Sequence, residues 1–121
     1  MFFDSHAHIS CDPLADNAQE LIQRAHEQKV LGIVNICVDE KSLYKGLELA
    51  GSFEQFYNVA STTPHDVEKE GESFFPLVQK AAKEGKLVAI GETGFDYYYE
   101  HSPKELHKKN LKKHFSLALE N

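Results

Sequence analysis

The run VLGIVNICV at residues 30–38 is the clearest indication of the fold of this chain. It is almost wholly apolar, it is rich in β-branched residues, and charged residues bound it at Lys29 and Asp39. A strand with one face in water alternates apolar and polar residues, whereas a strand buried on both faces does not. Residues 30–38 are therefore predicted to form a buried strand of a parallel sheet.

Further strands alternate with helices in the predicted pattern. Apolar residues that recur every three or four positions indicate the helices, and Gly51 and Gly85 are placed to end the second and third of them. This alternation favours parallel strands joined by right-handed crossovers. Besides residues 30–38, strands are predicted at 2–8, 56–61 and 86–91, and helices at 13–29, 43–50 and 74–82.

The sequence SPKE at residues 102–105 predicts the start of a fourth helix. Serine as the N-cap, proline at the first helical position and glutamate at the third form a capping box. The helix is expected to continue nearly to the end of the sequence, with Leu111, Phe115 and Ala118 facing inward. His107 and His114 share that face and are expected at a packing seam rather than at a metal.

Residues 1–121 are therefore expected to form an α/β domain that is the parallel (β/α)4 half of a TIM barrel. A whole barrel takes about 250 residues, and the sequence stops after a predicted helix, where another strand would begin. A missing C-terminal half is one expectation, and association of copies through the open sheet edges is another. The alternative fold is a small flavodoxin-like domain, in which the first strand lies between the second and the third.

Composition narrows the class of protein. Of 121 residues, 41% are hydrophobic, which argues against a disordered chain. The 13 Lys+Arg against 19 Asp+Glu give a net charge of −6, which argues against nucleic-acid binding through net charge. Apolar stretches are too short for a membrane helix, so no membrane partner is expected. The N-terminus lacks a signal-peptide pattern, which predicts a cytoplasmic protein. Cys11 and Cys37 are expected to be reduced thiols.

A candidate metal site is indicated at two predicted strand ends. His6 and His8 alternate along the first strand, with Asp4 before them, so both imidazoles should point the same way and could bind one ion. Glu92 follows the fourth strand in a glycine-rich turn, where parallel sheets place their sites. The alternatives are that the two histidines are ordinary polar residues at a strand end and that Glu92 is an exposed glutamate in a turn. Nitrogen and oxygen ligands suit one or two divalent ions such as Mg, Mn or Zn.

The sequences FFDSHAHI at 2–9 and IGETGFDYY at 90–98 closely resemble those of the TatD-related metal-dependent hydrolases, several of which are DNases. The resemblance implies a TIM-barrel hydrolase that cleaves phosphodiester bonds with metal-activated water, with DNA or another phosphoester as substrate. It implies that His6 and His8 bind one ion and that Glu92, a catalytic residue, bridges to a second. Further ligands and a catalytic aspartate would come from later strands.

The chain departs from the family pattern at two positions. Ser10 stands where Asp or Asn is usual, and Thr63 stands where the family often has the first histidine of a Gly-x-His-Pro-His sequence, so that only His65 matches. His65 and Asp96 are candidate substrate-binding residues, although an exposed loop histidine is the simpler interpretation of His65. The tyrosines at 97–99 could stack a base, but packing across the barrel mouth is the favoured interpretation.

Two alternatives to a nuclease stay open. The chain could be a non-catalytic truncated or split fragment that needs a C-terminal half, or the site could serve an amidohydrolase that acts on C–N bonds. Nothing in the sequence by itself identifies the substrate. A downstream strand with a histidine and a later aspartate would favour the enzyme.

Overall fold

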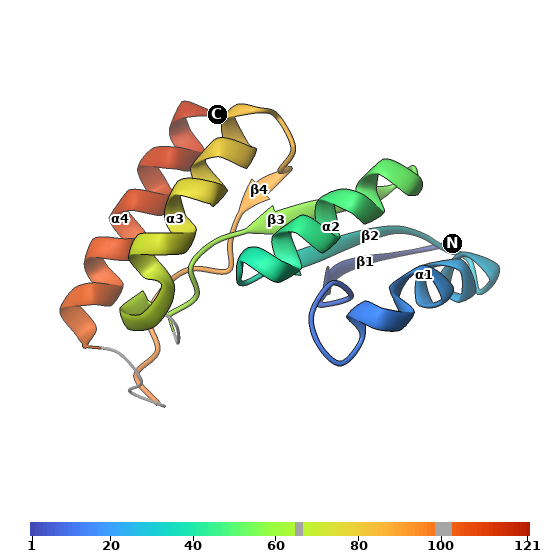
Figure 1. The fold of residues 1–121 in the computed structure, drawn as a ribbon, viewed down its shortest axis with the longest axis horizontal. Helices are drawn as coiled ribbons and strands as arrows, with labels where there is room; N and C mark the ends of the chain where they lie inside the picture. Colours follow the sequence, from blue (N-terminus) through green and yellow to red (C-terminus); the bar gives the residue numbers. More distant parts are fainter. Residues whose placement is uncertain (65–66, 99–102) are drawn as a thin grey trace.

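A computed structural model of the chain describes residues 1–64, 67–98 and 103–121 (Figure 1). Strands and helices alternate through these residues, as the sequence predicts. In chain order the elements are β1 (Phe2–Ala7), the short 3-10 helix η1 (Ala15–Asn17), α1 (Ala18–Glu27), β2 (Val30–Cys37), α2 (Glu40–Ser52), β3 (Phe56–Ala60), α3 (Val67–Lys83), β4 (Ala89–Ile90) and α4 (Lys104–Glu120).

The four strands form one parallel sheet in the order β1-β2-β3-β4. Each strand therefore lies beside the one before it, which confirms the predicted half barrel and excludes the flavodoxin-like order. All four carboxyl ends lie at the same edge of the sheet. Residues that follow β1 and β4 are thus placed at one mouth of the half barrel.

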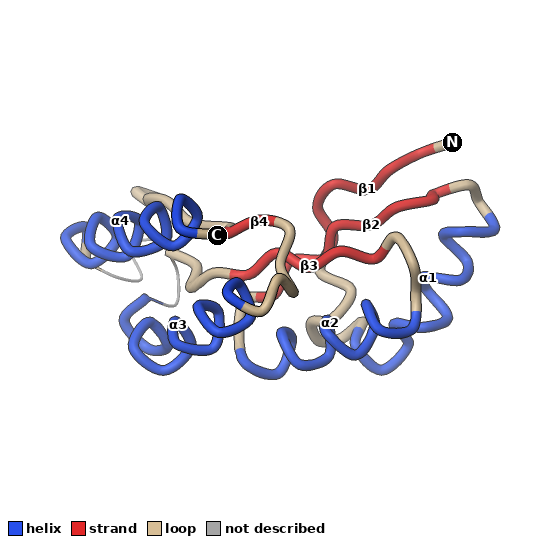
Figure 2. Tube along the Cα trace, turned by 90° about the horizontal axis from the view of Figure 1, so that it is seen from above, coloured by secondary structure: helices blue, strands red, loops and turns tan. Residues whose placement is uncertain are grey.

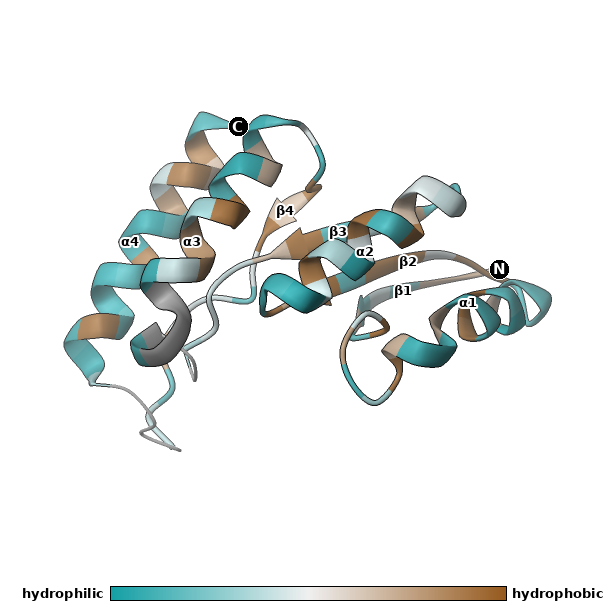
Figure 3. Cartoon of the chain, in the orientation of Figure 1, coloured by the Kyte–Doolittle hydropathy of each residue, from teal (hydrophilic) through white to brown (hydrophobic). Residues whose placement is uncertain are grey.

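The helices cover one face of the sheet. Figure 2 shows α1, α2 and α3 on the same side of the strands, with α4 beyond β4. In the described part of the chain no helix covers the other face, and Phe2 and Phe3 of β1 are 68% and 58% exposed. Figure 3 shows that α1 and α2 turn hydrophilic residues away from the sheet. The sheet is therefore one-sided, with its apolar β1 edge open.

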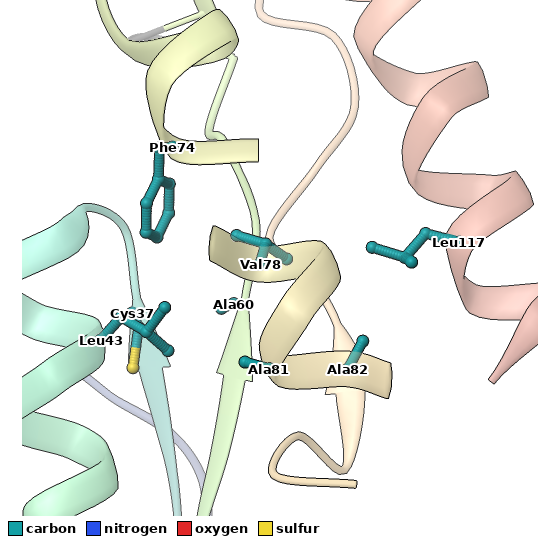
Figure 4. Close-up of a cluster of buried hydrophobic side chains, with 8 residues drawn as sticks. All are labelled: Cys37, Leu43, Ala60, Phe74, Val78, Ala81, Ala82 and Leu117. Carbon is teal, nitrogen blue, oxygen red and sulfur yellow. The ribbon is translucent and has the colours of Figure 1, made fainter. Parts of the chain in front are cut away.

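Two apolar clusters fill the space between sheet and helices. The first joins α3 to α2, β2, β3 and α4, and Figure 4 shows Phe74 and Val78 of α3 at its centre with Leu117 reaching in from α4. The second lies under α1 and α2 around Ile22 and Phe56. Burial of these side chains is the main favourable free energy that fixes the helices on the sheet.

The helix ends are set by local hydrogen bonds. Asp39 caps α2, because its carboxylate accepts the Ser42 N–H while the Ser42 hydroxyl accepts the Asp39 N–H. α3 ends in a Schellman motif: Gly85 has φ +67°, its N–H donates to the Ala82 carbonyl, and the Lys86 N–H donates to the Ala81 carbonyl. Gly85 thus ends α3 as predicted.

Several predicted boundaries are wrong. α2 continues one residue past Gly51, α3 begins seven residues before residue 74, and the predicted helix at 13–29 is η1 followed by α1. β4 is only two residues long, and Ala89 and Ile90 pair with Val59 and Ala60 of β3. Pro103 occupies the N-cap of α4 instead of its first turn, and Ser102 lies outside the described residues.

The inward face of α4 also differs from the prediction. His107, Asn110, His114 and Leu117 are buried, whereas Phe115 is 61% exposed and Ala118 is exposed as well. The helix turns a mainly polar stripe toward the sheet, so the two histidines do lie at a packing seam. No described helix is long and apolar enough to cross a membrane.

Candidate metal centre

The strand β1 delivers two imidazoles to the mouth of the half barrel. His6 lies within β1 and His8 directly follows its last residue, so the two side chains share one face, with ring centroids 5.1 Å apart. The backbone N–H of His6 donates to Oδ1 of Asp4 over 3.0 Å. The chain then turns, and the Cys11 N–H donates to the His8 carbonyl. The histidines are thus held where the strand meets its first loop.

The carboxylate comes from the opposite edge of the sheet. Glu92 lies two residues beyond β4 and follows a cis Gly91–Glu92 peptide bond. The Gly91 N–H donates to the Ala60 carbonyl of β3, and the Ser61 hydroxyl donates to the Glu92 carbonyl. Gly94 has φ +150°, a backbone conformation that favours glycine. The backbone of Glu92 is therefore attached to the segment that leaves β3.

His6, His8 and Glu92 meet at this mouth. Nε2 of His6 lies 3.3 Å from Oε2 of Glu92, and Nε2 of His8 lies 3.6 Å from the same oxygen. The three donor atoms all lie within 4.8 Å of one another, and among the described residues they form the one group of three or more ligand side chains that could hold an ion. The side chains are 55%, 41% and 45% exposed, so solvent reaches all three.

The donor set fits a divalent metal ion. Two imidazole nitrogens and a carboxylate oxygen are ligands that Zn, Mn and other divalent ions accept in proteins. Neither cysteine belongs to this group of donor atoms. Cys11 Sγ lies 3.9 Å from Nδ1 of His8, the ring nitrogen that does not face Glu92, and burial raises the pKa of Cys11. Burial raises the pKa of Cys37 to about 12, so this thiol stays protonated.

A buried amide network supports the loop behind His8. The Ser10 N–H donates to Oδ1 of Asn35 over 3.0 Å, and Nδ2 of Asn35 donates to the Ser10 hydroxyl over 2.8 Å and to Oδ1 of Asn58 over 3.0 Å. Nδ2 of Asn58 in turn donates to the Gly46 carbonyl of α2. Sequence reasoning missed Asn35 and Asn58, although Asn35 interrupts an apolar run and could have been noticed there.

α4 fixes the segment that follows β3. The Thr62 N–H donates to Nε2 of His114 over 3.1 Å, and Nδ2 of Asn110 donates to the Thr62 carbonyl over 2.9 Å. Nδ1 of His114 lies 2.8 Å from the Asn110 carbonyl. Since one ring nitrogen must donate and the other must accept, His114 is the neutral Nδ1–H tautomer, and burial lowers its pKa.

The loop after Glu92 rests on the same helix. The Asp96 N–H donates to Nδ1 of His107 over 3.4 Å, and Oδ1 of Asp96 accepts the Tyr98 N–H over 2.8 Å. Phe95 and Tyr97 stack with centroids 5.6 Å apart, and Lys104 Nζ lies 5.0 Å from the centre of the Tyr97 ring. The carboxylate of Asp96, a predicted substrate-binding residue, thus also stabilises the loop in which it lies.

Three further positions were singled out from the sequence. His65 lies outside the described residues. Thr63, where the family often has a histidine, is buried. Ser10 is buried too, and its hydrogen bonds to Asn35 give it a structural place in the first loop.

Comparison with known proteins gives consistent matches over nearly the whole chain. The model of the family described as TatD related DNase matches residues 3–121. An uncharacterized metal-dependent hydrolase of Bacillus subtilis, YabD, is 30% identical over 120 residues, which cover 99% of this chain and 47% of YabD. The uncharacterized metal-dependent hydrolase BU355 of Buchnera aphidicola is 20% identical over 125 residues, which cover 96% of this chain and 47% of BU355.

A solved structure shows the same fold. The crystal structure of YjjV, a TatD homologue from Escherichia coli K12, superposes with a TM-score of 0.84 at 25% identity, over 97% of this chain and 46% of YjjV. The chain therefore spans about half the length of the proteins that it matches.

Proposed function

This chain belongs to the TatD-related DNase family, and we propose that His6, His8 and Glu92 bind a divalent metal ion used to hydrolyse phosphodiester bonds in DNA. The observation that carries the proposal is the convergence of two imidazole nitrogens and one carboxylate oxygen within 4.8 Å, from opposite edges of the sheet. Two relatives of the chain are named as metal-dependent hydrolases, which supports the same chemistry.

Each residue has a distinct part in the proposed site. The two histidines present Nε2, a neutral donor, and Glu92 supplies the single negative charge of the three. Oε2 of Glu92 faces both imidazoles, so Glu92 would share an ion with both histidines, and the resemblance to the family implies that it would also bridge to a second ion. Such an ion lowers the pKa of a water ligand to ~7 and neutralises charge on a phosphate oxygen. We propose that Asp96, in the loop after Glu92, contributes to substrate binding, and His65 stays a second candidate for that part.

The hydrolase as a whole is proposed to need more ligands than these three. Relatives are about twice as long as the chain, and resemblance to the family implies ligands from later strands. For the 121-residue chain by itself we expect weak metal binding and little or no turnover. Nuclease assays on a labelled DNA strand, with Mg²⁺, Mn²⁺ or Zn²⁺ and with EDTA, test this expectation. Robust EDTA-sensitive turnover would show instead that three ligands suffice.

Metal binding is the direct test of the site. Isothermal titration calorimetry on EDTA-treated protein is expected to show binding of at least one of the three ions, and His6→Ala and Glu92→Gln should weaken it. His26→Ala is the matched control, because His26 lies on α1 against Phe53. Failure of all three ions to bind, or an equal effect of the control, would contradict the proposal. Turnover of amides and not of DNA would favour the amidohydrolase alternative.

A further inference from the structure

We propose that the buried polar stripe of α4, formed by His107, Asn110 and His114, positions the Glu92 carboxylate for metal binding. The three residues recur at helical spacing and point toward the sheet, where all three are buried. They contact the segments that leave β3 and β4 at the mouth of the half barrel. The inference rests on the proposed metal site, and it adds residues that lie outside the ligand set.

The stripe holds Thr62 by both of its backbone groups. Nε2 of His114 accepts the Thr62 N–H, and Nδ2 of Asn110 donates to the Thr62 carbonyl. The carbonyl of Asn110 also orients the His114 ring, because Nδ1 donates to it. With both backbone groups bonded, Thr62 can neither rotate nor shift without breaking a buried hydrogen bond.

Glu92 is attached to this fixed segment on one side and to α4 on the other. Ser61, the neighbour of Thr62, donates its hydroxyl to the Glu92 carbonyl. Four residues after Glu92, the Asp96 N–H donates to Nδ1 of His107. Glu92 therefore lies between two points that both depend on the polar stripe, and its side chain leaves the backbone from a fixed origin.

Packing by itself does not account for the choice of this helix face. Phe115 and Leu119 are exposed while two histidines and an asparagine are buried, although burying a polar group is unfavourable unless it finds a partner. Nδ2 of Asn110, Nε2 of His114 and Nδ1 of His107 find their partners in backbone groups of the two segments after β3 and β4, whereas Nε2 of His107 is buried without a partner among the described residues. A stripe of directional hydrogen bonds fixes those segments more exactly than apolar contacts would. Substitution of residues that orient metal ligands typically lowers metal affinity 10- to 100-fold.

Four variants separate positioning from stability. Asn110→Ala and His114→Leu remove the bonds to Thr62, whereas His114→Gln keeps one donor and one acceptor on a side chain of similar length. Leu117→Ala is the control, because Leu117 is buried on the same helix but belongs to the apolar cluster with α3. Two quantities are measured at a temperature where each variant is folded by circular dichroism: Zn²⁺ and Mn²⁺ affinity, and nuclear Overhauser effects between Glu92 and the His6 and His8 rings in metal-free protein.

Asn110→Ala and His114→Leu are expected to lower the affinity about tenfold and to weaken the Overhauser effects. His114→Gln and Leu117→Ala should keep both near wild-type values. Unchanged Overhauser effects in Asn110→Ala and His114→Leu, or the same loss in Leu117→Ala, would overturn the inference. If the wild-type protein binds neither ion, the proposed function fails, and the metal-free measurement still decides whether the stripe positions Glu92.

Discussion

Nε2 of His6 lies 3.3 Å from Oε2 of Glu92, although His6 lies in β1 and Glu92 follows β4, the two outermost strands of the sheet. Neighbouring strands lie about 4.8 Å apart, so in a flat sheet three steps would separate these strands by about 14 Å. The sheet must curve for the two side chains to meet. The contact is thus a measure of barrel curvature as well as the basis of the candidate metal site.

Removal of the Glu92 charge is expected to weaken metal binding more than removal of one imidazole. Glu92 supplies the only carboxylate of the three donors, and its Oε2 faces both histidines. Titration calorimetry with Mn²⁺ should therefore rank Glu92→Gln below His8→Ala in affinity, and excess metal should restore more binding in His8→Ala. A reversed order would show that the imidazoles dominate the site.

A methyl group at Gly46 should destabilise the protein by about 1–3 kcal/mol through overpacking. It would lie 2.9 Å from Nδ2 of Asn35 and from Sγ of Cys37, and closer still to Oδ1 of Asn58. Urea unfolding of Gly46→Ala measures the loss. Gly51→Ala is the matched control on the same helix, since nothing lies within 4 Å of a methyl group there, and it should gain about 1 kcal/mol or less. Similar values for the two variants would contradict the packing described around Asn35.

Acid should weaken the fold through His114. Burial lowers the pKa of this imidazole below its usual value of 6.5, and the positive charge of Lys113 acts in the same direction. As the pH falls through 6.5 the unfolded chain therefore takes up the proton first, so stability is full above 6.5 and declines toward the lowered pKa of the folded state.

Urea unfolding between pH 8 and pH 5 checks this dependence. His114→Gln, which cannot titrate, should show a shallower decline than the wild type. Ser116→Ala, an exposed change on the same helix, should keep the wild-type slope. A decline of equal steepness in His114→Gln would assign the acid sensitivity to other groups.

Two phenylalanines test the orientation of the helices. Phe74 of α3 is buried in the first apolar cluster, so Phe74→Ala should cost about 3–5 kcal/mol, a large part of the 5–15 kcal/mol typical of a domain. Phe115 of α4 is exposed, and Phe115→Ala should change the unfolding free energy by about 0.5 kcal/mol or less. A comparable loss from both variants would indicate that Phe115 is buried, as the sequence predicts, and would contradict the orientation of α4 described above.

The sequence was sufficient to predict the order of the strands and to propose three metal ligands. The apolar run at 30–38 and the positions of His6, His8 and Glu92 at strand ends are local patterns, and parallel topology brings strand ends together. The face of α4 could not be predicted in the same way. Its apolar periodicity favours Phe115, but the buried face is decided by backbone groups at Thr62, whose need for partners arises only once β3 and α4 are packed.

The same limit explains the residues around the site that sequence reasoning missed. Ser61 and Asn110 act on backbone atoms of residues distant in the chain, and a backbone partner leaves no pattern of residue types to recognise. The buried pair Asn35 and Asn58 is different, because the two asparagines sit opposite each other in the register of β2 and β3. Once two adjacent strands are predicted, paired polar residues inside them indicate a buried network.

The meeting of His6 with Glu92 has a consequence for the way the chain unfolds. In the described part of the chain, the first and last strands of the sheet pair with β2 and β3 and not with each other. We therefore expect that β4 and α4 can detach while the contacts among the first three strands persist. An ion shared by the two residues would tether the ends of the sheet and close a loop that contains most of the described chain. Closing a long loop removes more entropy from the unfolded state than closing a short one. Chelation should therefore lower the cooperativity of unfolding as well as its midpoint.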